Sequence, residues 1–285
     1  MKDIKLRIKS VESTMQITKA MELVASSKLR KAKIRVEQSR PYFTALYKTL
    51  NDIAASNTEF SSVFLKAKPE VKKVGYVIIA GDRGLAGGYN SNMFKLFLQH
   101  SQGKEVCVIP VGKKAVDFCK RKNIEIVSDE FGIVEDVSIS DCSKAGAMMA
   151  SMFKNDEIDE VYIGYTTFVS MLSQEAAMMK ALPLVNIETN ETKEKSEGPK
   201  VLTLYEPSSE SLFNIIAPQY VAGLIYGALA ESWASELGAR RTAMDSASKN
   251  ASEMVEELSL KYNRARQAVI TSEITEIVSG ADALK

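Results

Sequence analysis

Apolar side chains in residues 1–57 recur at alternating steps of four and three residues. The positions are Ile4, Ile8, Val11, Met15, Ala25, Leu29, Ala32, Val36, Phe43, Leu46, Leu50 and Ile53, and only Thr18, Glu22 and Ser39 interrupt them. This spacing is the heptad pattern of a coiled-coil helix. It predicts one helix of roughly 80 Å, at a rise of about 1.5 Å per residue. Pro41 is expected to bend or break that helix near residues 37–40, because proline lacks a backbone donor and clashes with the preceding turn.

A second apolar stripe lies beside the first on the same predicted helix. It consists of Ile17, Met21 and Val24. A two-stranded coil buries only one stripe of each helix. The second stripe therefore indicates a partner that surrounds this part of the helix.

The pattern changes at Pro69, where short runs of β-branched and apolar residues begin. These runs occupy residues 74–80, 106–111, 124–127, 161–165 and 201–205. Helical patterns separate most of them, at residues 90–102, 113–122 and 142–154. Nearly continuous apolar strands that alternate with helices predict a mostly parallel sheet covered on both faces. Residues 70–206 are therefore expected to form a central, Rossmann-like α/β domain.

From Ser208 to the end of the chain the pattern is helical again. Ser208 is a suitable N-cap residue, and Pro218 is expected to mark a kink or a new helix start. The distal apolar stripe comprises Val255, Leu258, Tyr262, Ala265 and Val269, and then shifts by one residue to Ile270, Ile274, Ile277, Ala281 and Leu284. A shift of this kind rotates the stripe around the helix, as a stutter does in a coiled coil.

The two terminal segments are best explained as partners. We predict an α/β protein in which residues 1–57 and 208–285 form a long antiparallel coiled coil, with the α/β domain between them in sequence. The alternative is that each helix folds back separately onto the α/β domain. The residues expected in the seam of the coil are Ile4, Ile8, Val11, Leu29, Leu258, Ile270, Ile274 and Ile277.

The charge of the chain is unevenly distributed. The formal net charge is +1, yet residues 1–57 carry 12 Lys and Arg against 5 Asp and Glu. Near-neutrality of the whole chain argues against a protein defined by nucleic-acid affinity. The basic cluster at residues 28–35 suits phosphates, but no aromatic residues are interleaved with it for base stacking. A solvated face of the coil or a face that meets an acidic protein partner explains the cluster as well.

The residue types that usually carry chemistry are sparse. Cys107, Cys119 and Cys142 show no metal-binding or disulfide spacing, and His100 is the only histidine, so no metal site or cofactor is expected. A Ser-His or Cys-His pair would have to use that one histidine, and the acidic residues 156–160 fit a solvated loop, so an independent enzyme is not indicated.

No apolar run comes close to the roughly 18 to 20 residues that span a bilayer, and no targeting segment is visible. We therefore expect a cytoplasmic protein, complete as written, that does not insert into a membrane.

The glycine-rich stretch AGDRGLAGGYNSN, residues 80–92, follows a predicted strand and precedes a predicted helix. Such a turn could direct its amides at a phosphate. Its spacing, however, is neither that of the dinucleotide-binding motif nor that of the P-loop, because no lysine follows the glycines. A structural turn that carries Asp82 and Arg83 is the better interpretation.

Four stretches of the chain stand out for their length and specificity: ITKAMELVASSKLRKA (17–32), DRGLAGGYN (82–90), SELGARRTAMDSASKNA (235–251) and KYNRARQAVITSEITEIVSGADAL (261–284). These stretches closely resemble the gamma subunit of F-type ATP synthases. They cover both terminal helices and the first turn of the α/β domain, in the order and spacing of that family.

The resemblance implies a rotor without a catalytic site of its own. The coil would insert into the hexamer of alternating alpha and beta subunits, and the α/β domain would lie near the epsilon subunit and the membrane c-ring. Proton or sodium flow would turn the ring and the shaft, which would drive the beta-subunit sites through the conformations of ATP synthesis or, in reverse, hydrolysis. Such a complex is peripheral on the cytoplasmic face of a bacterial cell membrane.

The resemblance also implies particular contacts near the C-terminus. Arg266, Gln267 and Thr271 match positions where the family's C-terminal helix meets an acidic catch loop of one beta subunit. Arginine suits an acidic loop because its planar fork donates paired hydrogen bonds to carboxylates. Ser272 departs from the longer Gln or Lys that is frequent in the family, so a contact from this position is not implied.

Two further regions match family positions near the beta subunit. Met21 and Arg240 fall where the coil lies near an acidic helix-turn-helix of beta, and the turn at residues 82–88, with Asp82 and Arg83, lies near the same region in the family. The redox-regulatory cysteine insertion of the chloroplast form is absent. The competing hypothesis is a nucleotide-binding α/β protein that uses the glycine turn and carries a coiled-coil arm for nucleic acid.

Overall fold

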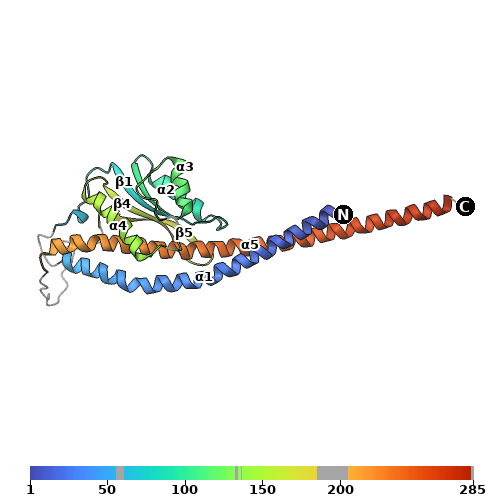
Figure 1. Cartoon of the computed structure of the whole chain (residues 1–285), viewed down its shortest axis with the longest axis horizontal. Helices are drawn as coiled ribbons and strands as arrows, with labels where there is room; N and C mark the ends of the chain where they lie inside the picture. The colour runs from blue at the N-terminus through green and yellow to red at the C-terminus, as the bar shows by residue number, and fades with distance from the viewer. Residues whose placement is uncertain (56–60, 132–133, 136, 185–204, 284–285) are drawn as a thin grey trace. The chain divides into compact units, whose positions relative to one another are not determined.

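The computed structural model describes residues 1–55, 61–131, 134–135, 137–184 and 205–283 (Figure 1). The helices are α1 (Lys2–Ala54), α2 (Tyr89–His100), α3 (Lys113–Lys122), α4 (Ile139–Lys154), α5 (Ser209–Ala283) and the short 3-10 helix η1 (Val63–Leu65). The strands are β1 (Lys73–Ile79), β2 (Glu105–Val111), β3 (Glu125–Ile126), β4 (Glu160–Phe168) and β5 (Gln174–Leu182). The chain divides into two compact units, Lys28–Ala239 and Met1–Ser27 with Arg240–Lys285. Each unit is described by itself.

The strands of the unit Lys28–Ala239 form one five-stranded sheet in the order β3-β2-β1-β4-β5. β1 pairs in parallel with β2 and β4, β2 pairs in parallel with β3, and β4 pairs antiparallel with β5. The predicted α/β class with a mostly parallel sheet is confirmed. The expected strand at residues 201–205 lies, apart from Tyr205, outside the described residues.

Strand β5 has no counterpart among the predicted strands. Its sequence, QEAAMMKAL, contains no β-branched residue and has the composition of a helix. The segment is a strand because it pairs along the length of β4, from Leu182 opposite Val161 to Gln174 opposite Phe168. Tertiary pairing overrides local preference here.

The two faces of the sheet are covered by different helices. Alternate residues of β1 point to opposite faces, as the two-residue period of a strand requires. Val74, Tyr76 and Ile78 pack against α2 and α3, in one apolar cluster with Phe97 and Phe118. The intervening residues belong to a second, larger cluster that includes side chains of α4, α5 and the last turn of α1, among them Val77, Ile79, Met149, Val221, Leu50 and Ile53.

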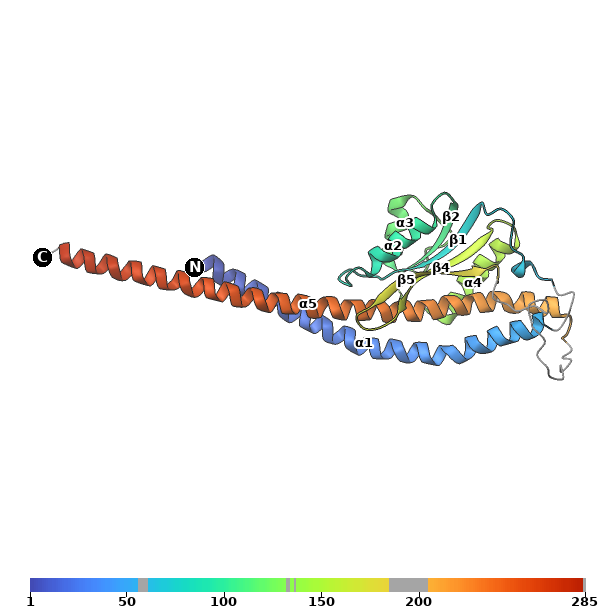
Figure 2. The ribbon, with the colours of Figure 1, turned by 180° about the vertical axis from the view of Figure 1, so that it is seen from behind.

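Within the same unit, α1 and α5 lie side by side (Figures 1 and 2). Leu29 packs in one cluster with Leu237. Further along α1, the Arg35 Nε donates to the Tyr226 hydroxyl at 2.8 Å. Residue numbers rise along α1 as they fall along α5, so the helices are antiparallel, as predicted.

In the unit Met1–Ser27 with Arg240–Lys285, a seam joins α1 and α5. Ile4, Ile8 and Val11 of α1 and Leu258 of α5 are half-buried, in agreement with the predicted heptad face. Ala25, in the same register, is buried, as are Met244, Ser248 and Ala251 of α5. The half-buried faces are those of a thin, two-stranded coil.

The seam does not extend to Ile270, Ile274 and Ile277. Their side chains are 45, 56 and 72% exposed, so their assignment to the seam is wrong for this chain taken alone. The reason is the length of α1. Thr18 lies opposite Ser248; counting sixteen residues from each brings α1 to its start at Lys2 and α5 only to Arg264.

Both helical prolines lie inside continuous helices. α1 continues through Pro41 and α5 continues through Pro218, so the expected break and the expected new helix start are not observed. A proline within a helix costs about 3 kcal/mol. Packing of neighbouring residues offsets this cost: Phe43 contacts Tyr226, and Ala217 is buried in the core.

The N-terminus of α5 is capped as predicted. The Ser208 hydroxyl accepts a hydrogen bond from the backbone amide of Ser211 at 3.1 Å. The expectation about apolar runs needs correction, because α5 contains a stretch long and apolar enough to cross a membrane. This stretch is 44% buried within the protein, and Phe213, Val221 and Ile225 of α5 lie in the core. These features are typical of the core helix of a globular domain.

Candidate partner-binding surfaces

The C-terminal part of α5 extends beyond the seam. Arg266, Gln267 and Thr271 all have exposed side chains. The helix is supported there by its own turns: the Thr275 hydroxyl donates to the Thr271 carbonyl at 2.8 Å. Before Arg266 on the same helix, the Lys261 ammonium lies 2.6 Å from the Glu257 carboxylate, and this hydrogen bond lowers the pKa of Glu257. The sequence-predicted contact residues are therefore presented on a regular helix.

Exposed apolar side chains surround these polar residues on α5. They are Val269, Ile270, Ile274, Ile277 and Val278. Monomeric proteins rarely leave contiguous apolar surface uncovered, and such surface usually marks an interaction site. The stripe shift seen in the sequence thus corresponds to apolar residues that face solvent in this chain alone.

The second stripe of α1 is largely exposed. The side chains of Ile17 and Val24 are 59 and 56% exposed, and Met21 is half-buried. Arg240, on α5 in the same unit, is also half-buried. The heptad register explains this result, because the seam already uses Ala25 and its heptad equivalents.

The glycine turn between β1 and α2 uses Asp82 internally. Its carboxylate accepts hydrogen bonds from the backbone amides of Lys113 at 3.2 Å and Val134 at 3.1 Å. Asp82 therefore ties the turn to the start of α3 and to the following loop. The Arg83 side chain is exposed and is the member of the pair that is oriented for an outside contact.

The same turn is poorly suited to a phosphate. The amide of Gly81 already donates to the Asn90 side-chain oxygen at 2.8 Å. A Cβ at Gly81 would lie 2.6 Å from a carboxylate oxygen of Glu236, which is buried. The buried Glu236 side chain packs against the turn at this point and leaves no space there for a phosphate. Sequence reasoning missed Glu236, because nothing in a helical sequence indicates which distant loop a side chain meets.

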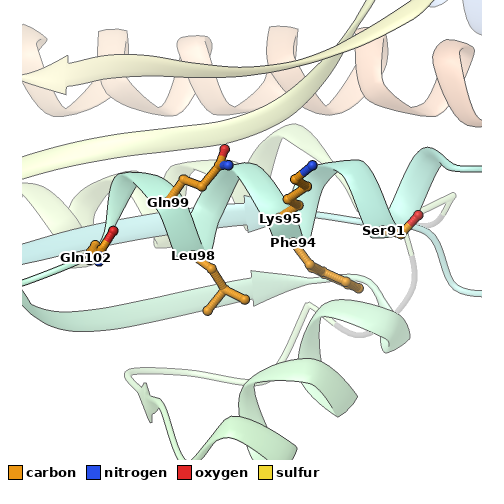
Figure 3. Close-up of a pocket in the computed structure, with 6 residues that line it drawn as sticks. All are labelled: Ser91, Phe94, Lys95, Leu98, Gln99 and Gln102. Carbon is orange, nitrogen blue, oxygen red and sulfur yellow. The ribbon is translucent and has the colours of Figure 1, made fainter.

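A surface hollow of about 460 Å³ lies along α2 (Figure 3). It is lined by Ser91, Phe94, Lys95, Leu98, Gln99 and Gln102. These residues lie on α2 and, in the case of Gln102, in the turn that follows it, and Figure 3 shows Phe94 and Leu98 on one side and Lys95 and Gln99 on another. The lining includes no histidine, cysteine or carboxylate, the side chains that most often serve as general bases or metal ligands.

The three cysteines are buried and the histidine is half-buried. Burial raises the pKa of Cys107 to about 11 and that of Cys142 to about 12. Burial and then the nearby Lys104 ammonium lower the pKa of His100, whose Nδ1 lies 2.9 Å from the Tyr76 hydroxyl. Within the described part of the chain, no group of three or more His, Cys, Asp or Glu side chains could hold a metal ion.

Comparisons with known proteins give a consistent result along the whole chain. A family model described as ATP synthase matches residues 1–284. The ATP synthase gamma chain of Alkaliphilus metalliredigens is 46% identical over all of this chain and 99% of its own length. The sodium ion specific ATP synthase gamma chain of Acetobacterium woodii is 47% identical, over 99% of this chain and 98% of its own.

Solved structures show the same fold at lower identity. A chain of the Euglena gracilis mitochondrial ATP synthase, in a structure of OSCP, F1 and c-ring, matches with a TM-score of 0.66 and 20% identity, over 99% of this chain and 94% of its own. A chain from the central stalk and c-ring of the Tetrahymena thermophila mitochondrial ATP synthase gives a TM-score of 0.59 and 24% identity, over 81% of this chain and 99% of its own. The family model and the bacterial relatives show that the chain belongs to the ATP synthase gamma chain family.

Proposed function

We propose that this chain is the central rotor shaft of an F-type ATP synthase. Rotation of a membrane c-ring, driven by ions, would turn the shaft, and the shaft would force the beta-subunit catalytic sites through the states of ATP synthesis. The observation that carries the proposal is the end of α5, which extends past its coil partner with Ile270, Ile274 and Ile277 exposed. A helix end of this kind requires an enclosing partner.

The proposed coupling requires an uneven shaft. A ligand that binds two conformations equally shifts neither, so the shaft has to present different contacts to each catalytic subunit. The described surfaces meet this requirement, because Ile17 and Val24 lie on the outer side of α1 while the exposed isoleucines lie on α5. The two helices offer no symmetric face to three identical partners.

Arg266, Gln267 and Thr271 are proposed to bind an acidic loop of one beta subunit, since their exposed polar ends project from the same region of α5 as the apolar stripe. Met21, Arg240 and Arg83 are proposed as secondary contacts with the same subunit type. The alpha and beta subunits, epsilon and the c-ring are the proposed partners, at the cytoplasmic face of a bacterial cell membrane. No catalytic residue, cofactor or metal is assigned to this chain.

Co-purification tests the proposal. A tagged chain expressed in its native host should be recovered from membranes together with two larger nucleotide-binding subunits. Recovery as a free protein, with tight ATP binding by the isolated chain in calorimetry, would support the nucleotide-binding alternative instead. The Gly81 amide, which already donates to the Asn90 side chain, argues against that second outcome.

A further inference from the structure

The face of α5 that meets the sheet changes character along its length. Phe213, Ala217, Val221 and Ile225 lie in the apolar core, whose contacts have no preferred direction. Two turns later buried polar residues join the apolar ones: Ser232 and Ser235 are fully buried, next to the buried Ala234. Buried hydroxyls need hydrogen-bond partners, and such bonds are directional.

Both serines bind the backbone of one residue of β4. The Thr166 amide donates to the Ser232 hydroxyl at 3.2 Å, and the Ser235 hydroxyl donates to the Thr166 carbonyl at 2.9 Å. The ladder between β1 and β4 ends at Gly164, so Thr166 lies beyond the last residue that β1 pairs. The helix therefore takes the place of the missing strand for this stretch of backbone.

Residues of α2 and of the end of β4 form further hydrogen bonds with the same part of α5. The Tyr89 hydroxyl, in the first turn of α2, lies 2.7 Å from the Ser232 hydroxyl. At the end of β4, the Phe168 amide donates to a Glu231 carboxylate oxygen at 3.2 Å. Rotation of α5 about its own axis would break all of these directional bonds together, in addition to disturbing the close apolar packing of the helix.

We infer that Ser232 and Ser235 are positioning residues that lock the shaft helix to the α/β domain against rotation, so that torque applied to the domain reaches α5 without slip. This inference deepens the proposed function and rests on it. Neither serine touches a nucleotide or a partner in this role. They act through β4 and α2, which belong with this part of α5 to the unit Lys28–Ala239.

The test uses the whole complex, purified and reconstituted into vesicles. Ser232→Ala with Ser235→Ala removes both hydroxyls with little change of volume, and Tyr89→Phe removes one bond without changing shape. ATP hydrolysis and ATP-driven ion pumping are measured on the same vesicles. We expect hydrolysis to be retained while the number of ions pumped per ATP falls, more for the double variant than for Tyr89→Phe.

Ser62→Ala is the matched control. Ser62 is buried and its hydroxyl binds Asn214 of α5, but it lies outside the sheet. We expect this variant to keep the wild-type pumping ratio. If both test variants assemble and pump as the wild type does, the inference is overturned. If the wild-type chain itself does not enter an ATP-hydrolysing complex, the proposed function fails instead, and the two failures are therefore distinguishable.

Discussion

The hydroxyls of Thr18 and Ser248 lie 2.7 Å apart in the seam between α1 and α5, although 230 residues separate them in sequence. Both side chains are buried. Thr18 also donates to the Met15 carbonyl at 3.0 Å. Thr18 therefore interrupts the apolar heptad pattern with a polar side chain, whose hydrogen-bond partner is Ser248 on the other helix of the coil.

This pair predicts an asymmetric response to substitution. Thr18→Val leaves the buried Ser248 hydroxyl without its partner and should lower the free energy of unfolding by about 1–3 kcal/mol. Ser248→Ala should cost less, because Thr18 keeps its bond to Met15. Urea unfolding of the isolated chain, followed by circular dichroism, measures both changes. Thr14→Val, at an exposed position of the same helix, should change stability little, and equal losses at Thr14 and Thr18 would contradict the prediction.

Two helical glycines should respond to alanine in opposite directions. A Cβ at Gly146 of α4 would lie 2.8 Å from the backbone nitrogen of Ala222, so Gly146→Ala should destabilise the α/β domain by about 1–3 kcal/mol. A Cβ at Gly227 of α5 would meet no atom within 4 Å, so Gly227→Ala should stabilise it by about 0.5–1 kcal/mol. Thermal melting of the isolated chain decides both. A loss of stability at Gly227 would show that the helix cannot accept the methyl group.

Substitutions in the exposed apolar stripe of α5 should affect assembly with partner subunits but not the stability of the isolated chain. Ile274→Asp should leave the melting of the isolated chain unchanged, because the side chain is 56% exposed there, but should prevent recovery of the chain with the larger subunits. Ile8→Asp, in the half-buried seam, is the contrasting variant and should lower the melting temperature of the isolated chain. Normal assembly of Ile274→Asp would rule out an enclosing partner at this position.

The polar residues of the same region are expected to affect coupling. Arg266→Ala with Gln267→Ala should reduce ATP synthesis in reconstituted vesicles without altering the fold, since both side chains are exposed. Lys249→Ala with Asn250→Ala, two exposed residues earlier on α5, is the control. The wild-type Lys249 forms an ion pair with Asp245 at the surface, and surface pairs contribute little to stability, so its loss in the control should not affect folding. Equal synthesis by both double variants would remove Arg266 and Gln267 from the mechanism.

Asp159 makes the stability of the α/β domain depend on pH. Burial acts to raise its pKa, but hydrogen bonds from the Lys73 and Lys72 amides and the Lys68 ammonium outweigh burial and lower the pKa below its usual 3.8. The ionised form therefore stabilises the folded state above the unfolded pKa, and this stability is lost as the pH falls through the lower folded pKa.

Asp159→Asn should accordingly destabilise the isolated chain at neutral pH. The difference from the wild type should shrink as the pH falls below about 4, where the unfolded wild-type chain begins to take up the proton, and should be lost as the pH falls through the lower pKa of folded Asp159. Urea unfolding at a series of pH values measures this. Asp156→Asn, at an exposed partner of the same lysine, should have a small effect, and a pH-independent loss at Asp159 would show that the carboxylate charge is not what matters.

Local patterns determined much of the architecture. The heptad face of α1 from Ile4 to Leu29, the β-branched runs of β1 and β2 and the Ser208 cap were all predictable, because each depends on residues a few positions apart. The resemblance of the terminal stretches to a known family predicts partner contacts at Arg266 and Gln267, whose side chains are exposed. These positions carry no local signal of chemistry.

Only the tertiary structure decided what covers each of these faces. Strand β5 exists because β4 accepts it as a partner, and Ser232 is a buried anchor because the ladder of β1 stops before Thr166. Ile274 continues an apolar stripe in the sequence but lies beyond the reach of α1. Periodicity records which side of an element is apolar or polar, whereas burial and hydrogen bonding depend on distant segments whose positions are set by the packing of the whole chain.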